Sequence, residues 1–244
     1  MKDNFSTQSD NYAKFRPGYP SEFFDYLYGL LPVKETAWDC ATGNGQVASQ
    51  LCKKFRQVYA TDISQSQLDN AVQASNIFYS VQPAEKTSFS DREFDLVVVA
   101  QAIHWFDFEK FYDEVRRTAK RDALICVLGY GGMVIDVEIK KLVKDFYENV
   151  VGPYWDPERK YIDANYETIP FPFKEVGTPA FETVLEWSPD HLLGYLGTWS
   201  AVKHFIKKNG SNPLDKFSTG LAKVWKSGPK TVRFPLLVKI GRVH

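Results

Sequence analysis

Short apolar runs alternate with segments of helical periodicity between Thr36 and Leu128, and this alternation constrains the fold more than any other feature of the chain. The run Phe94–Ala100 (FDLVVVA) is almost continuously apolar, as expected of a strand covered on both faces of a parallel sheet. Alternating strands and helices of this kind predict an α/β fold. The chain has no stretch of about 18 apolar residues, so we expect no membrane span.

The expected elements follow from the spacing of the apolar residues. We expect strands at Thr36–Cys40, Val58–Thr61, Ile77–Val81, Phe94–Ala100 and Ala123–Leu128. We expect helices at Pro20–Leu31, Gln46–Phe55, Ser64–Ser75 and Phe108–Ala119. Ser64 and Gln67 form an S-x-x-Q capping box that supports the third of these helices.

The pattern changes after the fifth expected strand. Apolar spacing predicts a helix from Ile135 to Val150, and five prolines then indicate a long irregular loop over 151–180, a type of segment that often covers a functional site. We expect a strand at Phe181–Trp187, at least two helices within Pro189–Lys226 and a final strand at Thr231–Ile240. The fold class is therefore α/β: a Rossmann-like, mostly parallel sheet of seven strands, with helices on both faces and a C-terminal helical and loop cap over the substrate.

Composition gives no reason to expect a macromolecular partner. Thirty Lys and Arg balance thirty Asp and Glu, which gives no reason to expect binding to nucleic acid or to a membrane surface. The three cysteines, Cys40, Cys52 and Cys126, lie far apart and form no C-x-x-C pair, so we expect neither disulfides nor a metal site. The polar N-terminus lacks the apolar stretch of a signal peptide. These features predict a cytoplasmic protein, either monomer or dimer.

The most informative segment is Trp38–Gln46 (WDCATGNGQ), which places Gly43 and Gly45 between a strand and a helix. Glycine lets the backbone turn sharply and approach a ligand closely, and doubly wound sheets bind ligands beyond the strand ends at their switch point. Asp62 ends the second expected strand, where a carboxylate is placed to accept hydrogen bonds from two ribose hydroxyls. The segment therefore predicts a cofactor that contains a nucleoside.

Two cofactor classes share this layout. A dinucleotide enzyme uses G-x-G-x-x-G/A with a helix N-terminus at the pyrophosphate, and Gly43, Gly45 and Ala48 satisfy that spacing. Asp39 favours S-adenosyl-L-methionine, because a carboxylate there repels a pyrophosphate but receives the ammonium of a methionine moiety. We therefore expect S-adenosyl-L-methionine and keep a nicotinamide-dependent oxidoreductase as the alternative.

A set of motifs in a fixed order makes the chain recognisable. These motifs are Tyr12–Pro20 (YAKFRPGYP), Asp39–Gln46 (DCATGNGQ), Tyr59–Asp62 (YATD), Pro83–Glu85 (PAE), Phe94–Val97 (FDLV), Ala100–Phe106 (AQAIHWF) and Gly197–Val202 (GTWSAV). With them the chain resembles the class I S-adenosylmethionine-dependent methyltransferases of the methyltransferase type 11 family, in the branch similar to trans-aconitate methyltransferases. Ala41 departs from the family pattern, which has its first glycine there. Because the alanine methyl is small, we expect cofactor binding to survive.

The resemblance implies a role for each residue of the cofactor site. Asp39, Ala41 and Gly43 line the methionine side with Gly45 in the same loop, Asp62 holds the ribose, Ile63 packs on the adenine, Ala84 and Glu85 flank its edge, and Gln101 with Ala102 lies under the cofactor's centre. Tyr12, Arg16 and Tyr19 belong to an N-terminal segment that closes over the site. For Arg16, contact with the cofactor's carboxylate, contact with a substrate and a surface salt bridge all remain open.

His104 is the candidate catalytic residue, because it follows the fourth strand's carboxyl end, where the methyl group is expected. A hydroxyl or amine acceptor needs a base, whereas a carboxylate acceptor does not. The alternative for His104 is packing and hydrogen bonding beside Trp105 and Phe106.

The expected acceptor is a small organic molecule, with a carboxylate among the candidates. From Pro189 to His244, ten Lys and Arg stand against two Asp, which either reflects solvated helix faces or helps to attract an anionic substrate. A methyltransferase-like module that acts on a macromolecule is the alternative. We expect residues 1–130 to form the N-terminal lid and the cofactor-binding core. Residues 131–244 are expected to form a substrate cap inserted before and between the last two strands.

Overall fold

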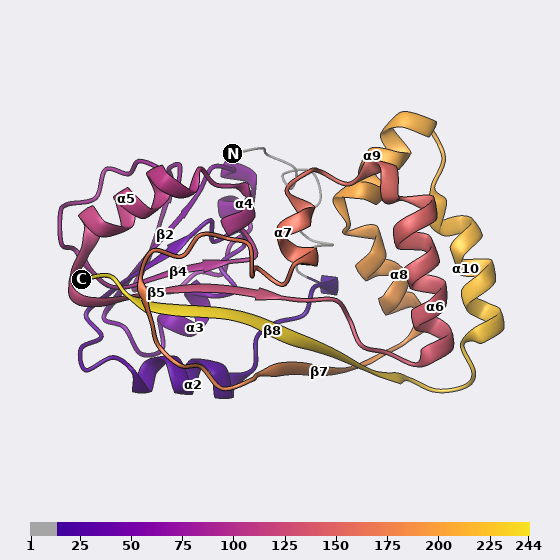
Figure 1. Cartoon of the computed structure of the whole chain (residues 1–244), viewed down its shortest axis with the longest axis horizontal. Helices are drawn as coiled ribbons and strands as arrows, with labels where there is room; N and C mark the ends of the chain where they lie inside the picture. The colour runs from indigo at the N-terminus through magenta and orange to yellow at the C-terminus, as the bar shows by residue number, and fades with distance from the viewer. Residues whose placement is uncertain (1–13) are drawn as a thin grey trace.

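The computed structural model describes residues 14–244, so Tyr12 lies outside the described residues. The five expected parallel strands form the core of one sheet (Figure 1): β1 (Thr36–Cys40), β2 (Gln57–Asp62), β3 (Ile77–Val81), β4 (Phe94–Ala100) and β5 (Ala119–Tyr130). Their order is β3-β2-β1-β4-β5, and each neighbouring pair is parallel. The chain order reverses between β1 and β4, which places the switch point of the sheet there.

Helices cover both faces of this core, as expected. The helix α5 (Phe108–Thr118) lies on one face, where Phe111 packs with Trp38 and Val97. On the opposite face, α2 (Ser21–Gly29) and α3 (Ala48–Leu51) bury Phe23 and Leu51. Alternate residues of β1, β4 and β5 contribute to the two apolar layers, since successive side chains of a strand point to opposite faces. The sheet is therefore buried on both sides.

Two of the expected helices are shorter than predicted. Only α3 remains of the helix expected from Gln46 to Phe55, and turns flank it. The helix α4 (Gln65–Asp69) begins at Ser64, whose hydroxyl accepts a hydrogen bond from the Gln67 N–H at 3.4 Å. It ends well before Ser75, because the chain turns at Asn70 towards β3. The predicted cap is present, but the apolar spacing overstated the length of the helix.

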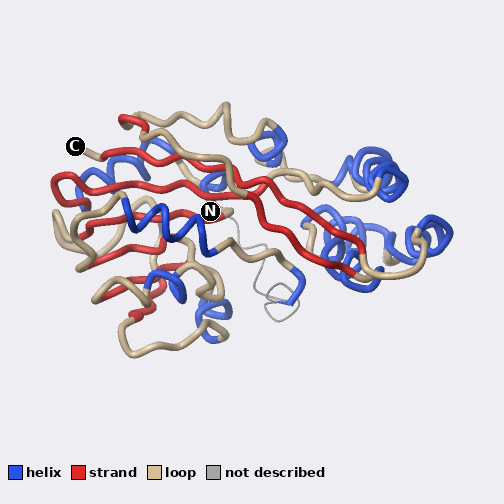
Figure 2. Tube along the Cα trace, turned by 90° about the horizontal axis from the view of Figure 1, so that it is seen from below, coloured by secondary structure: helices blue, strands red, loops and turns tan. Residues whose placement is uncertain are grey.

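The far edge of the sheet differs from the expected seven strands. The long strand β8 (Lys230–Arg242) is antiparallel to β5, as expected for the last strand. An eighth strand, β6 (Lys174–Glu175), pairs with the end of β8, and β7 (Glu182–Trp187) pairs only with its first half. The expected strand at Phe181–Trp187 is present as β7, but it is joined to the sheet only through β8 and does not lie beside the parallel strands. The first half of β8 runs beyond β5, and β7 follows it out of the core (Figure 2).

The two strands lead to a group of helices beside the core (Figure 1). This helical unit comprises α6 (Val137–Asp145), α8 (Pro189–Gly197), α9 (Ser200–Asn209) and α10 (Pro213–Val224), with the π-helical turn η2 (Phe146–Val150) continuing α6. It has its own apolar core, which includes Trp187, Trp199 and Phe217. Residues 151–180 are largely irregular, with two short helices, η3 (Gly152–Tyr154) and α7 (Arg159–Asp163). In Figure 1, α7 lies between the core and the helical unit.

Candidate functional site

The switch point carries unusual backbone conformations at the ends of β1 and β4. Ala41, directly after β1, has a φ of 55°, and Gln101, directly after β4, also has a φ of 55°. Left-handed conformations are strained for residues with a side chain and gather at functional sites. Gly43 (55°) and Gly45 (80°) continue the loop after β1. The chain thus turns sharply at the carboxyl ends of the neighbouring strands β1 and β4, and leaves this end of the sheet open.

Asp39 is buried at the foot of this loop, with 1% of its surface exposed. Its Oδ2 accepts hydrogen bonds from the Thr42 hydroxyl at 2.5 Å and from the Ala48 N–H at 2.8 Å. Its Oδ1 is buried and has no hydrogen-bond partner among the described residues. Burial raises the pKa of Asp39 to about 7, against the hydrogen bonds that lower it. A buried carboxylate oxygen without a partner is costly, so it marks a place for a positively charged donor.

Asp62 holds the loop itself, which sequence reasoning did not anticipate. Its Oδ2 accepts the Gly43 N–H at 2.9 Å, and its Oδ1 accepts the Ser64 N–H at 2.9 Å. The carboxylate therefore links the end of β2 to the glycine turn after β1. Burial is the main cause that raises the pKa of the Cys40 thiol, and the negative charges of Asp39, Glu85 and Asp62 raise it further. Three carboxylates thus lie close together around the ends of β1 and β2.

A hollow opens over this loop and contains about 480 Å³ of empty space, open solvent included. We call it the glycine-loop hollow; its lining residues are Arg16, Pro17, Tyr19, Asp39, Ala41, Thr42, Gly43, Asn44, Gln46, Val47, Ala100, Gln101 and Tyr130. Segments from the N-terminus and from the ends of β1, β4 and β5 therefore meet at one place.

The hollow brings together six of the residues expected at the cofactor: Arg16, Tyr19, Asp39, Ala41, Gly43 and Gln101. Gly45, Asp62, Ile63, Ala84, Glu85 and Ala102 do not line it. Ala84 and Ala102 are buried in the apolar layer below, and the Glu85 carboxylate accepts the Asp107 N–H at 3.3 Å. Tyr130 was missed, although its place at the end of β5 before Gly131 was a usable signal.

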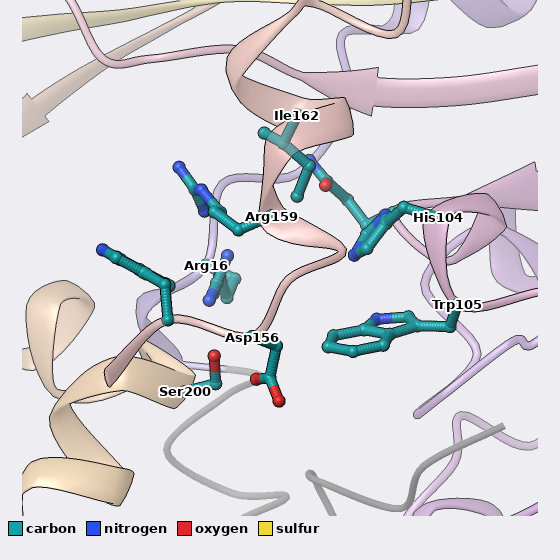
Figure 3. Close-up of a pocket in the computed structure, with 9 residues that line it drawn as sticks. Arg16, His104, Trp105, Asp156, Arg159, Ile162 and Ser200 are labelled. Carbon is teal, nitrogen blue, oxygen red and sulfur yellow. The ribbon is translucent and has the colours of Figure 1, made fainter. Parts of the chain in front are cut away.

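A second hollow adjoins the first and shares Arg16 and Gln101 with it. We call it the His104 hollow; its lining residues are Arg16, Gln101, His104, Trp105, Trp155, Asp156, Arg159, Ile162 and Ser200. Figure 3 shows His104 and Trp105 on one side, Ser200 on the other and Arg16 between them. The hollow therefore lies between the carboxyl end of β4 and the helical unit. The loop 151–180 supplies Trp155, Asp156, Arg159 and Ile162 to its wall.

His104 is buried on the short helix η1 (Ile103–Trp105), with 5% of its surface exposed. Its Nδ1 lies 3.2 Å from the Tyr166 hydroxyl. Burial, reinforced by the positive charges of Arg159 and Arg16, lowers the pKa of His104 to about 3. The imidazole is therefore neutral near pH 7, and a group with so low a pKa is a weak base.

Arg16 joins the N-terminal segment to both other parts of the molecule. Its Nε donates to the Thr198 hydroxyl at 2.8 Å and its Nη2 to the Thr198 carbonyl at 3.4 Å. Its Nη1 donates to the Tyr130 hydroxyl at 2.9 Å, and the guanidinium lies over the Tyr195 ring at 5.3 Å. These contacts fix a positive charge where the two hollows meet.

Residues 14–244 contain neither a candidate metal site nor a helix that could cross a membrane. The structure contains no group of three or more His, Cys, Asp or Glu side chains placed to hold a metal ion. None of its helices is both long enough and apolar enough to span a membrane.

Comparisons with known proteins point to one family. A family model for a methyltransferase domain matches residues 38–127. A Dictyostelium discoideum protein named as a methyltransferase is 32% identical over 229 residues, covering 92% of this chain and 87% of that protein. A solved structure from Anaeromyxobacter dehalogenans, described as a type II methyltransferase, is 35% identical with a TM-score of 0.85, covering 94% of this chain and 98% of that chain.

A more distant relative carries the cofactor in its name. A Saccharomyces cerevisiae protein named as an S-adenosylmethionine-dependent methyltransferase is 24% identical over 180 residues, covering 67% of this chain and 60% of that protein. The matched region of the family model contains β1 to β4 and most of β5, with the loop after β1 near its start.

Proposed function

This chain belongs to the class I S-adenosylmethionine-dependent methyltransferases, and we propose that it methylates a small organic acceptor that carries a negative charge. Its cofactor is S-adenosyl-L-methionine, which supplies a methyl group already activated on a sulfonium. The observation that carries the proposed acceptor is the Arg16 guanidinium, which its hydrogen bonds to Thr198 and Tyr130 fix in the wall of the His104 hollow.

The residues of the glycine-loop hollow fit the cofactor. We propose that the Oδ1 of Asp39, which is buried without a hydrogen-bond partner among the described residues, receives the ammonium of the methionine moiety. Ala41, Gly43 and Gly45 shape the loop, and Gln101 lies at the border with the second hollow. We propose that Asp62, Ile63, Ala84, Glu85 and Ala102 form the ribose and adenine side of the same site. Tyr19 and Arg16, with Tyr12 outside the described residues, are proposed to cover it.

The His104 hollow is proposed to hold the acceptor. A carboxylate acceptor is already ionised near pH 7 and needs no base, which agrees with a neutral His104 whose pKa lies near 3. In this proposal His104 orients the acceptor through hydrogen bonding, and the positive charge of Arg16 attracts it. The branch similar to trans-aconitate methyltransferases fits such an anionic acceptor.

We further propose a division of the chain at about residue 130. Residues 1–130 form the lid and the cofactor-binding core, and 131–244 form the cap over the substrate. The wall that Trp155, Asp156, Arg159, Ile162 and Ser200 contribute to the His104 hollow supports this division. A cap that excludes water strengthens the electrostatic interactions within the site.

Methyl transfer from labelled S-adenosyl-L-methionine tests the acceptor class. Small metabolites from a cell extract are separated by ion exchange into anionic, neutral and cationic fractions, and proteins and nucleic acids are kept as a fourth fraction. Each fraction is then incubated separately with the enzyme and the labelled cofactor, because esterification removes the charge of the carboxylate. We expect labelled product only from the anionic fraction, in a form that mild alkali cleaves to methanol, as it does a methyl ester. Label confined to the macromolecular, neutral or cationic fractions would contradict the proposed acceptor.

A further inference from the structure

A third hollow adjoins the His104 hollow, and the proposed reaction does not account for it. We call it the outer hollow; it contains about 860 Å³ of empty space, open solvent included, between the end of β5, α6, α7 and α8. Arg159 and Ile162 line both this hollow and the His104 hollow. The first turn of α7 therefore lies at the border where the two hollows adjoin.

The inner surface of the outer hollow is largely aromatic and apolar. Tyr147, Trp199 and Val143 line it, and the Tyr147 and Trp199 rings pack edge to face with centroids 5.6 Å apart. Trp199 is 5% exposed and Val143 is 9% exposed, so both are fixed by the packing of the helical unit. Such a surface suits an apolar or aromatic body.

The charges around this hollow are mostly positive. Lys140 and Lys144 lie one helical turn apart on α6 and both line the hollow. Lys144 has a loose ion pair with Glu148, at 3.8 Å, in which both side chains are largely exposed. Arg159 is the third cation, and Asp163 is the one lining carboxylate among the described residues. The surplus of positive charge favours an anionic ligand.

Arg159 is held in place on the side of the outer hollow. Its Nε donates to the Tyr147 hydroxyl at 2.9 Å and to Asp163 at 3.1 Å, and its guanidinium lies over the Trp155 ring at 4.5 Å. In Figure 3 this guanidinium turns away from His104 and Trp105. The stem of Arg159 thus contributes to one hollow while its charge is directed away from the reacting end.

We propose that the outer hollow is a second subsite for the acceptor, which takes an apolar or aromatic body that ends in an anionic group. This subsite rests on the proposed function. The acceptor is amphipathic, and its reacting end lies near His104. Its body packs against Tyr147 and Trp199, and its far anionic end meets Lys140, Lys144 and Arg159. The acceptor is therefore longer than the His104 hollow alone would hold.

Calorimetry on the protein loaded with S-adenosylhomocysteine tests this subsite with 4-phenylbutyrate and its neutral amide as probes. We expect the acid to bind more tightly than the amide, and the double variant Lys140→Gln/Lys144→Gln to weaken binding of the acid about tenfold, since each exposed cation contributes modestly. Lys141→Gln is the matched control, because Lys141 lies on the same helix but pairs with Glu138 and does not line the hollow. It should leave binding unchanged.

The variant Arg16→Gln separates the two proposals. If the acid loses affinity in Arg16→Gln but not in the double lysine variant, it occupies the His104 hollow; the second subsite is then wrong while the proposed anionic acceptor stands. If the double lysine variant weakens binding and the anionic fraction yields no labelled product, the subsite stands and the proposed acceptor class is wrong. Equal losses in Lys141→Gln and the double variant would overturn the subsite.

Discussion

The two sides of the site are assembled differently. On the cofactor side, the polar contacts join residues close in sequence: Asp39 bonds Thr42 and Ala48, and Asp62 bonds Gly43, 19 positions away. On the acceptor side, Arg16 bonds Thr198, 182 positions away, and His104 lies beside Tyr166, 62 positions away. The first side is a local consequence of parallel strands and their turns. The acceptor side depends on how the helical unit and the loop 151–180 pack against the core.

This comparison predicts that cofactor-side substitutions change both folding and cofactor affinity. Asp62→Ala leaves the Gly43 and Ser64 N–H groups without their acceptor, and such a loss costs about 1–3 kcal/mol when the groups cannot reach water. We expect a loss of about 2 kcal/mol in the free energy of unfolding and more than tenfold in affinity for S-adenosylhomocysteine. Urea unfolding and calorimetry measure the two, with Asp62→Asn as the conservative control. Full stability in Asp62→Ala would show that the carboxylate does not hold the loop.

An acceptor-side substitution is expected to spare the cofactor. Thr198→Val keeps the shape of a buried side chain but removes the acceptor of the Arg16 Nε–H and the donor to the Tyr195 carbonyl. We expect methylation of the anionic fraction to fall at least about tenfold, a loss typical of one hydrogen bond to a charged group. Affinity for S-adenosylhomocysteine should stay within about twofold, and Thr198→Ser should restore activity. A cofactor loss as large as the loss of methylation would place Arg16 on the cofactor side instead.

Replacing His104 decides between its two interpretations. A general base contributes about 10²- to 10⁴-fold to a rate, whereas an orienting imidazole contributes less. Because the pKa of His104 lies near 3, we expect His104→Asn to lose less than about tenfold in turnover, and the wild-type rate to show no titration of this group between pH 6 and 8. Steady-state rates across that pH range measure both. A loss of 10³-fold with a new pH dependence would make His104 the base.

The smallest effect concerns the left-handed backbone of Ala41. Its φ of 55° disfavours any residue with a Cβ by about 1–2 kcal/mol, part of which the greater freedom of glycine in the unfolded chain offsets. We expect Ala41→Gly to raise the free energy of unfolding by about 0.5–1 kcal/mol. Ala222→Gly, on the exposed face of α10, should instead lower it by about 1 kcal/mol. Urea unfolding of both variants checks the opposite signs.

The same contrast explains what the sequence predicted and what it did not. The apolar run Phe94–Ala100 placed β4 at its observed bounds, because a buried parallel strand leaves a continuous apolar pattern. The strained position at Ala41 also had a signal, since a glycine is usual there. No sequence signal predicted the pairing of β7 with the first half of β8, because the alternation of apolar and polar residues does not indicate which strand is the partner. The contact of Arg16 with Thr198 likewise depends on tertiary packing across 182 positions.

The most direct test of the account is the pH dependence of cofactor binding at Asp39. Burial raises the pKa of Asp39 to about 7, so in the ligand-free protein stability falls as pH rises from about 4 towards 7, because the unfolded chain releases that proton first. A cationic ammonium beside Oδ1 favours the ionised form, so affinity should rise with pH through neutrality. The variant Asp39→Asn removes this titration.

We therefore expect calorimetry to show S-adenosylhomocysteine binding more tightly to the wild type at pH 8 than at pH 6, with proton release near pH 7. Asp39→Asn should bind at least about tenfold more weakly, since it loses a charge-assisted hydrogen bond, and equally at both pH values. NAD should give no binding heat. Wild-type affinity in Asp39→Asn, or tight NAD binding, would contradict the assignment of the cofactor to the loop after β1.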